Sequence, residues 1–362
     1  LALPVGAGTP TVGELGFFRE KGEDREFVPR NAPEVFNRGS IHWRTQFWDG
    51  RIEEIGGVLV TPAGADLPAG LSTVLAAQAM FPVTSRDEMR GSLADALQGN
   101  ELASIADDDL PAIWQALMER LLSTAGYPQL FAAAFPEVAE SELGFEHAAE
   151  AIAAFEAEAY GYDDSPFDNY LRGDLAALTA AEKRGAILFY GQAGCVECHQ
   201  GTLLSDQQYY NLAVPQLGPG KDPLTGLDLG RFGVTGDGQD LFRFRTPPLR
   251  NVSATGPWMH NGAFSDLSDA VLHHLDAAKS LRKYKPSKQL LQPELEATVV
   301  DDDATNETLV AELDLPASKL SGRELKDLIS FLESLTVPNL DERLLLTIPE
   351  SVPSGQLEDG MP

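Results

Sequence analysis

Cys195-Val196-Glu197-Cys198-His199 decides how this chain is interpreted, because it contains both cysteines of the sequence. The C-x-x-C-H pattern indicates covalent haem: each thiol forms a thioether with a vinyl group, and the imidazole binds the iron. A zinc site normally needs a second pair of ligands, and a redox dithiol normally lies in a βαβ unit. A structural disulfide is the remaining alternative. We therefore predict that Cys195 and Cys198 hold haem c and that His199 is the proximal iron ligand.

The composition is that of an acidic protein with enough apolar residues for substantial cores. Its 362 residues suffice for two domains, and 43% of them are hydrophobic. A formal charge of −28 argues against nucleic-acid binding. The same charge would steer a basic electron carrier toward the surface, although adaptation to a saline environment explains it equally well. No run of eighteen apolar residues, as a membrane span needs, occurs.

Haem c is assembled outside the cytoplasm, so we predict a periplasmic or otherwise extracytoplasmic protein. Leu1-Ala2-Leu3-Pro4 contains no initiator methionine, and no basic or apolar signal region follows it. We therefore expect a processed or truncated chain.

The spacing of apolar residues predicts a mainly α fold in two domains. Three- and four-residue spacing predicts helices over 71–81, 110–122 and 145–160. Asp163-Asp164-Ser165-Pro166 then interrupts the pattern. We place the domain boundary there, which gives domains over 1–162 and 163–345 and a loose tail over 346–362.

Two helices are expected to enclose the haem in the second domain. Thr179 and Glu182 form a capping box before a helix that runs into the C-x-x-C-H motif, and Gly185 in that helix would permit a close crossing. Ser321 and Glu324 form a second capping box. It begins an amphipathic helix whose apolar face consists of Leu325, Leu328, Ile329, Leu332 and Leu335.

The iron needs a sixth ligand or an open face, and few side chains qualify. His273 and His274 lie in a helix predicted over 267–278, and Met259 and His260 lie in the loop before it. Imidazole and thioether are both competent axial ligands. A solvated or core role is the alternative for each of them.

Further motifs occur in a fixed order around the haem motif: Arg30-Asn31-Ala32-Pro33, Gln46-Phe47-Trp48-Asp49-Gly50-Arg51, Asp87-Glu88-Met89-Arg90-Gly91, Thr246-Pro247-Pro248-Leu249-Arg250-Asn251-Val252 and Gly256-Pro257-Trp258-Met259-His260-Asn261-Gly262. With this set, residues 20–340 resemble the bacterial di-haem cytochrome c peroxidases. The related di-haem enzyme that matures methylamine dehydrogenase shares the same plan. The resemblance implies two cytochrome c-like domains, each with one covalent haem.

The resemblance also assigns roles to individual residues. It makes His199 the proximal ligand of the C-terminal haem, where electrons enter. It makes His274, fourteen positions after His260, the sixth-ligand candidate ahead of Met259 and His273. Trp48 matches the tryptophan between the two haems. Glu88 matches the distal acid, which moves a proton between the oxygens of bound peroxide.

A calcium site and several partners are implied in the same way. Asn31, Thr255 and Pro257 match a site in which one side-chain amide and two backbone carbonyls offer hard oxygen ligands. The implied substrate is hydrogen peroxide. The implied donor is a small soluble cytochrome c or cupredoxin, which we expect to be basic, and the chain could form a homodimer.

Two departures from the family pattern affect the functional hypothesis. The first domain has no C-x-x-C-H motif, and we expect the second haem on residues preceding this chain. The loop where family members carry a removable distal histidine offers only residues 20–27, so we expect an open distal face. Our main hypothesis is a periplasmic di-haem peroxidase. The alternatives are a mono-haem electron-transfer protein and a haem oxidase that matures a partner protein.

Overall fold

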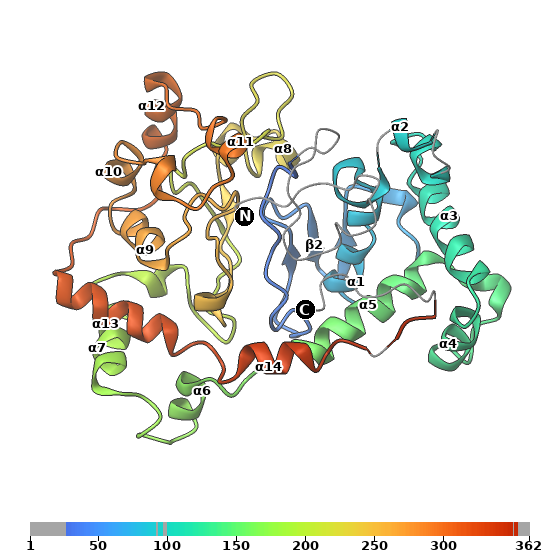
Figure 1. Ribbon diagram of the computed structural model, residues 1–362, viewed down its shortest axis with the longest axis horizontal. Helices are drawn as coiled ribbons and strands as arrows, with labels where there is room; N and C mark the ends of the chain where they lie inside the picture. The colour runs from blue at the N-terminus through green and yellow to red at the C-terminus, as the bar shows by residue number, and fades with distance from the viewer. Residues whose placement is uncertain (1–26, 92, 97–99, 350, 354–362) are drawn as a thin grey trace.

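The computed structural model describes residues 27–91, 93–96, 100–349 and 351–353. Helices α1–α5 form one half and α6–α13 the other, as Figure 1 shows. The helices are α1 Val74–Ala79, α2 Leu93–Ala96, α3 Leu110–Ser123, α4 Tyr127–Ala134, α5 Phe145–Ala159, α6 Pro166–Leu171, α7 Ala180–Phe189, α8 Phe232–Thr235, α9 Leu267–Leu275, α10 Ala277–Leu281, α11 Pro293–Glu296, α12 Asp303–Ala311, α13 Gly322–Glu333 and α14 Leu340–Leu345. The mainly α prediction is confirmed.

The first half combines a small sheet with the three helices that the sequence predicts. Strands β1 Thr45–Gln46, β2 Ile52–Ile55 and β3 Val58–Val60 form an antiparallel sheet in that order. Ile52 from this sheet packs into one core with Trp114 of α3 and Phe145 of α5. Helix α1 is shorter than its predicted range because the Thr73 hydroxyl caps it by accepting the Ala76 N–H at 3.1 Å.

In the second half, α7 and α13 cross at very close range. Both predicted capping boxes are present, at Thr179 before α7 and at Ser321 before α13. A Cβ atom on Gly185 would lie 1.9 Å from the Asp327 carbonyl oxygen, so only glycine allows this approach. The predicted role of Gly185 is confirmed. Phe189 and Phe331 then meet in the core, with ring centroids 5.2 Å apart.

The single helix predicted over 267–278 is wrong. Helix α9 ends at Leu275, and α10 begins at Ala277 after one non-helical residue, Asp276. The Asp276 carboxylate accepts the Lys279 N–H at 3.2 Å and so caps α10. Aspartate competes in this way with helical backbone bonds, which apolar periodicity does not reveal.

The two halves are joined by short strands and by the end of the chain. Strand β4 Tyr209–Tyr210 pairs with β5 Phe244–Arg245 beside the first half. Helix α14 lies along the lower edge of the molecule, between α6 and α5 (Figure 1). Leu340 packs there against Phe36 of the first half. The domain boundary at 162/163 stays a prediction. No helix in the described residues has the length and apolar character needed to cross a bilayer.

Candidate functional site

The haem-type motif forms one 3-10 turn, Cys195–Glu197, just after α7. Both thiols are free and half-buried. Burial raises the pKa of Cys195 to about 11 and also raises the pKa of Cys198. A redox dithiol needs a lowered thiol pKa, so this environment argues against that alternative. Within the described ranges, no group of three or more His, Cys, Asp or Glu side chains could hold a metal ion.

His199 and His274 face each other at this turn. Their ring centroids lie 6.4 Å apart, with 58° between the ring planes. His199 Nδ1 lies 3.0 Å from the Leu204 carbonyl, and His274 Nδ1 lies 2.8 Å from the Ala270 carbonyl. When Nδ1–H donates to a carbonyl, the Nε2 lone pair is left for a metal.

The geometry of this pair fits a haem iron. An imidazole nitrogen binds a metal at about 2.0 Å, so two rings on opposite sides of one iron have centroids roughly 6 Å apart. Burial lowers the pKa of His199 to about 4 and also lowers the pKa of His274. Both rings are therefore neutral at pH 7, which is the form that binds metal.

The other sixth-ligand candidates have different surroundings. His273 Nε2 lies 2.8 Å from the Leu212 carbonyl, and its ring packs on Phe264. His260 stacks on Phe244 with centroids 3.5 Å apart. Met259 packs in the apolar cluster that contains Phe264. Because a helix turns by 100° per residue, adjacent histidines point in different directions, and only the fold distinguishes them.

Trp48 is buried between the segment around Asn31 and strand β5. Its Nε1 donates to the Asn31 carbonyl at 2.8 Å, and its own carbonyl accepts the Arg245 N–H at 2.7 Å. The Asn31 amide group lies against Pro257, with Nδ2 2.7 Å from the Pro257 carbonyl oxygen. Thr255 lies two positions earlier in the same loop. The structure thus brings Asn31 to the loop that holds the other two predicted calcium ligands.

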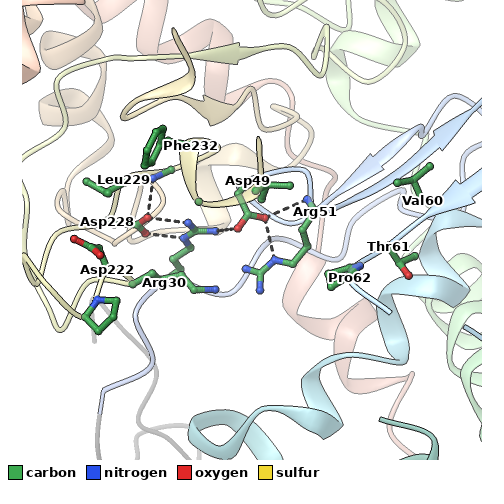
Figure 2. Close-up of a pocket in the computed structure, with 15 residues that line it drawn as sticks. Arg30, Asp49, Arg51, Val60, Thr61, Pro62, Asp222, Asp228, Leu229 and Phe232 are labelled. Carbon is green, nitrogen blue, oxygen red and sulfur yellow. Dashed lines mark hydrogen bonds and ion pairs between the residues drawn. The ribbon is translucent and has the colours of Figure 1, made fainter. Parts of the chain in front are cut away.

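A cavity of about 620 Å³ lies between the β2–β3 hairpin of the first half and the loop over 221–234 of the second. Figure 2 shows Arg30 in its wall between Asp228 and Asp49. Arg30 binds Asp228 at 2.6 Å and Asp49 at 2.6 Å, and Arg51 binds Asp49 at 2.9 Å. These carboxylates hold the pKa of Arg30 above its usual value despite burial. Lys221 also lines the cavity, where burial and Arg51 lower the pKa of its ammonium group to about 8.

Glu88 belongs to a single π-helical turn, Arg86–Arg90. Burial raises the pKa of Glu88, while Arg51 and Lys221 act in the opposite direction. Glu88 is therefore within electrostatic reach of two cations that line the cavity. Arg90, which is 1% exposed, anchors the turn by donating to the Leu102 carbonyl at 3.1 Å.

Sequence analysis missed several residues of this region. Lys221 and Asp228 lie in a loop rich in glycine and proline, where no periodic pattern marks them. Arg245 is fully buried although it is a charged residue beside a quoted motif. Of the loop predicted to leave the distal face open, residues 20–26 lie outside the described residues.

Comparisons with known proteins identify the family that the chain resembles. The family model for di-haem cytochrome c peroxidase matches residues 12–176. The chain is 34% identical over 243 residues to the cytochrome c551 peroxidase of Pseudomonas aeruginosa. The aligned part covers 67% of this chain and 57% of that peroxidase. It is 28% identical over 326 residues to the methylamine utilization protein MauG of Methylorubrum extorquens. This alignment covers 89% of this chain and 68% of MauG. The chain thus spans little more than half the length of the Pseudomonas relative.

Solved structures show the same fold. A MauG-like protein associated with microbial copper homeostasis superposes with a TM-score of 0.56 at 28% identity, over 90% of this chain and 81% of that structure. The diheme peroxidase BthA of Burkholderia thailandensis superposes with a TM-score of 0.56 at 21% identity, over 96% of this chain and 79% of that structure, which shows likeness of fold alone. The predicted resemblance is confirmed: this chain belongs to the di-haem cytochrome c peroxidase family.

Proposed function

We propose that the protein is an extracytoplasmic peroxidase that reduces hydrogen peroxide with electrons entering at a haem c on Cys195, Cys198 and His199. The observation that carries this proposal is the facing pair His199 and His274, each anchored through Nδ1. Haem iron, when bound, supplies the redox chemistry. If His199 and His274 both held the iron, this centre would pass electrons, and peroxide would be reduced elsewhere in the molecule.

Glu88 is proposed to handle the protons of the reaction. Reduction of one hydrogen peroxide to two waters consumes two protons and two electrons. A carboxyl group with a raised pKa can take a proton from one peroxide oxygen and deliver it to the other. Burial raises the pKa of Glu88, and the cations Arg51 and Lys221 limit that rise. A raised pKa makes the Glu88 carboxylate easier to protonate, as a proton-transfer role requires.

Trp48 is proposed to carry electrons between the two centres. Its bonds to the Asn31 carbonyl and the Arg245 amide fix the ring between the first half and strand β5. Two residues after Arg245, the Pro247 carbonyl faces His199. An aromatic ring held rigidly in this position shortens each electron-transfer step.

A calcium ion is proposed to bind Asn31, Thr255 and Pro257. The Asn31 amide already touches the Pro257 carbonyl oxygen, and turning that amide by 180° presents its oxygen instead. Amide and carbonyl oxygens are ligands that calcium prefers. The ion would hold Trp48 in position indirectly, because Trp48 Nε1–H donates to the Asn31 backbone carbonyl.

The deciding experiment combines intact mass and the pyridine haemochromogen assay on the full-length protein with peroxide turnover. We expect two covalent haems and reduction of peroxide by a small basic electron donor. One haem and no turnover would overturn the proposal in favour of a mono-haem electron carrier. Turnover that requires one specific protein partner, which is itself oxidised, would identify a maturation oxidase instead.

A further inference from the structure

Arg245 is a buried cation whose side-chain hydrogen bonds, within the described residues, go to backbone carbonyls. Its side chain is 1% exposed, and no ion pair to it occurs in the part of the chain that the structure describes. Nε donates to the Phe47 carbonyl at 2.9 Å, and Nη1 donates to the Thr246 carbonyl at 3.2 Å. Nη2 is buried without a hydrogen-bond partner. Buried polar groups are nearly always satisfied, so this nitrogen indicates a missing acceptor.

The surroundings of Arg245 make the missing group an anion. Arg38 and Arg245 lie 4.1 and 5.0 Å from the ring centroid of Trp43. Glu34 is already bound to Arg38. The Asp49 charge also acts on Arg245, but the Asp49 carboxylate is bound to Arg30 and Arg51. Burial and the Arg38 charge lower the pKa of Arg245 to about 9, which leaves it charged at pH 7. Gln46 Nε2 is a second buried donor without a partner in this region.

The position of Arg245 indicates where the anion comes from. Its backbone N–H binds the Trp48 carbonyl at 2.7 Å, and the Pro247 carbonyl, two residues further on, faces His199. The short segment 245–247 therefore contacts Trp48 at one end and His199 at the other. Haem carries two carboxylates as its propionates, and a guanidinium fork binds a carboxylate with two parallel hydrogen bonds.

We propose that Arg245, with Gln46 as a neighbouring donor, binds a haem propionate. This inference rests on the proposed haem at Cys195, Cys198 and His199. The bound cation stabilises the reduced haem, which carries one positive charge less than the oxidised haem. Arg245 thereby raises the midpoint potential, and it keeps the propionate ionised over the physiological pH range.

The test is spectroelectrochemical titration of the holoprotein with Arg245→Met, Arg245→Gln, Arg245→Lys and a control variant, Arg172→Met. Arg172 is half-exposed and pairs with Asp163 at the surface, so its replacement removes one charge far from any buried acceptor. We expect the Met and Gln variants to have a lower midpoint potential. That potential should also depend on pH between about 5 and 8, because an unpaired propionate then titrates. The Arg245→Lys variant should have a midpoint potential close to that of the wild-type protein.

The outcomes separate this inference from the proposed function. If wild-type protein carries no covalent haem, both fail. If it carries haem, and the Met and Gln variants match wild type and Arg172→Met in potential and pH dependence, water fills the site and only this inference fails. The Gln variant serves as the readout if Arg245→Met does not fold. With two haems present, the haem whose potential shifts is the one whose propionate is bound.

Discussion

The ring centroids of His199 and His274 lie 6.4 Å apart, although one follows α7 and the other ends α9. Each Nδ1 is engaged by a carbonyl of its own neighbourhood, Leu204 for His199 and Ala270 for His274. These contacts leave the two Nε2 atoms for the proposed iron. This relationship connects the sequence motif to the proposed electron-entry centre.

Replacing His274 with Ala should convert the C-terminal haem from a low-spin to a high-spin spectrum, because the iron loses its sixth ligand. Absorption and electron paramagnetic resonance spectra of the loaded protein measure this change. His42→Ala is the control, since His42 is exposed in the first half and its loss should leave the spectrum unchanged. A low-spin spectrum in His274→Ala would place the ligand elsewhere, for example at Met259.

Replacing Glu88 with Gln should slow peroxide reduction by about 10²-fold or more, the usual contribution of a general acid–base group. The spectrum of the His199 haem should not change. Asp87→Asn is a matched control, because Asp87 is exposed on the same turn. Steady-state turnover with an artificial donor measures both variants. Equal rates for Glu88→Gln and wild type would exclude Glu88 from the proton transfer.

Replacing Gly185 with Ala should destabilise the protein by about 1–3 kcal/mol, the usual effect of overpacking. The new Cβ would meet the Asp327 carbonyl oxygen where α7 crosses α13. Gly322→Ala is the matched control, because a Cβ there would have no neighbour within 4 Å, and alanine at a compatible site stabilises slightly. Denaturant unfolding followed by circular dichroism compares them. Equal stability of the two variants would contradict the close crossing.

Replacing Asp228 with Asn should reduce stability at pH 7 by about 3–5 kcal/mol, because Arg30 loses a buried partner. Arg30 holds the pKa of Asp228 and of Asp49 below their usual values despite burial. Their contribution is therefore complete above about pH 4 and is lost as the pH falls through the lowered pKa values.

Unfolding at a series of pH values should thus show a steep acid loss in wild type and a shallower one in Asp228→Asn. Asp163→Asn is the control, since its pair with Arg172 is exposed and contributes about 0–1 kcal/mol. An identical acid profile for Asp228→Asn and wild type would show that the buried pair does not set acid stability.

Removing calcium with a chelator should lower the thermal midpoint of the wild-type protein. The expected loss is about 2.7 kcal/mol relative to a calcium concentration 100 times the Kd. Asn31→Ala should abolish this difference, whereas Asn306→Ala, in helix α12, should retain it. Differential scanning calorimetry with and without calcium measures the effect. A calcium response that survives Asn31→Ala would reject the proposed ligand set.

Local sequence signals predicted much of the second half. The capping boxes at Thr179 and Ser321 depend on bonds between residues three positions apart, so they are visible in sequence. The helix break at Asp276 was not predicted. The Asp276 carboxylate caps the following helix, and the spacing of apolar residues does not show this bond. The short strands β1, β4 and β5 were missed as well, since two-residue strands carry no alternating pattern.

The sequence by itself determined that Cys195, Cys198 and His199 have the spacing of a C-x-x-C-H motif, because the three residues lie within five consecutive positions. Only the tertiary structure decided that His274 rather than His273 faces His199, since this depends on the direction in which α9 packs. It also decided that Arg245 is buried and that its Nη2 has no hydrogen-bond partner among the described residues. Burial and charge balance arise from segments far apart in the chain, and no local pattern encodes them.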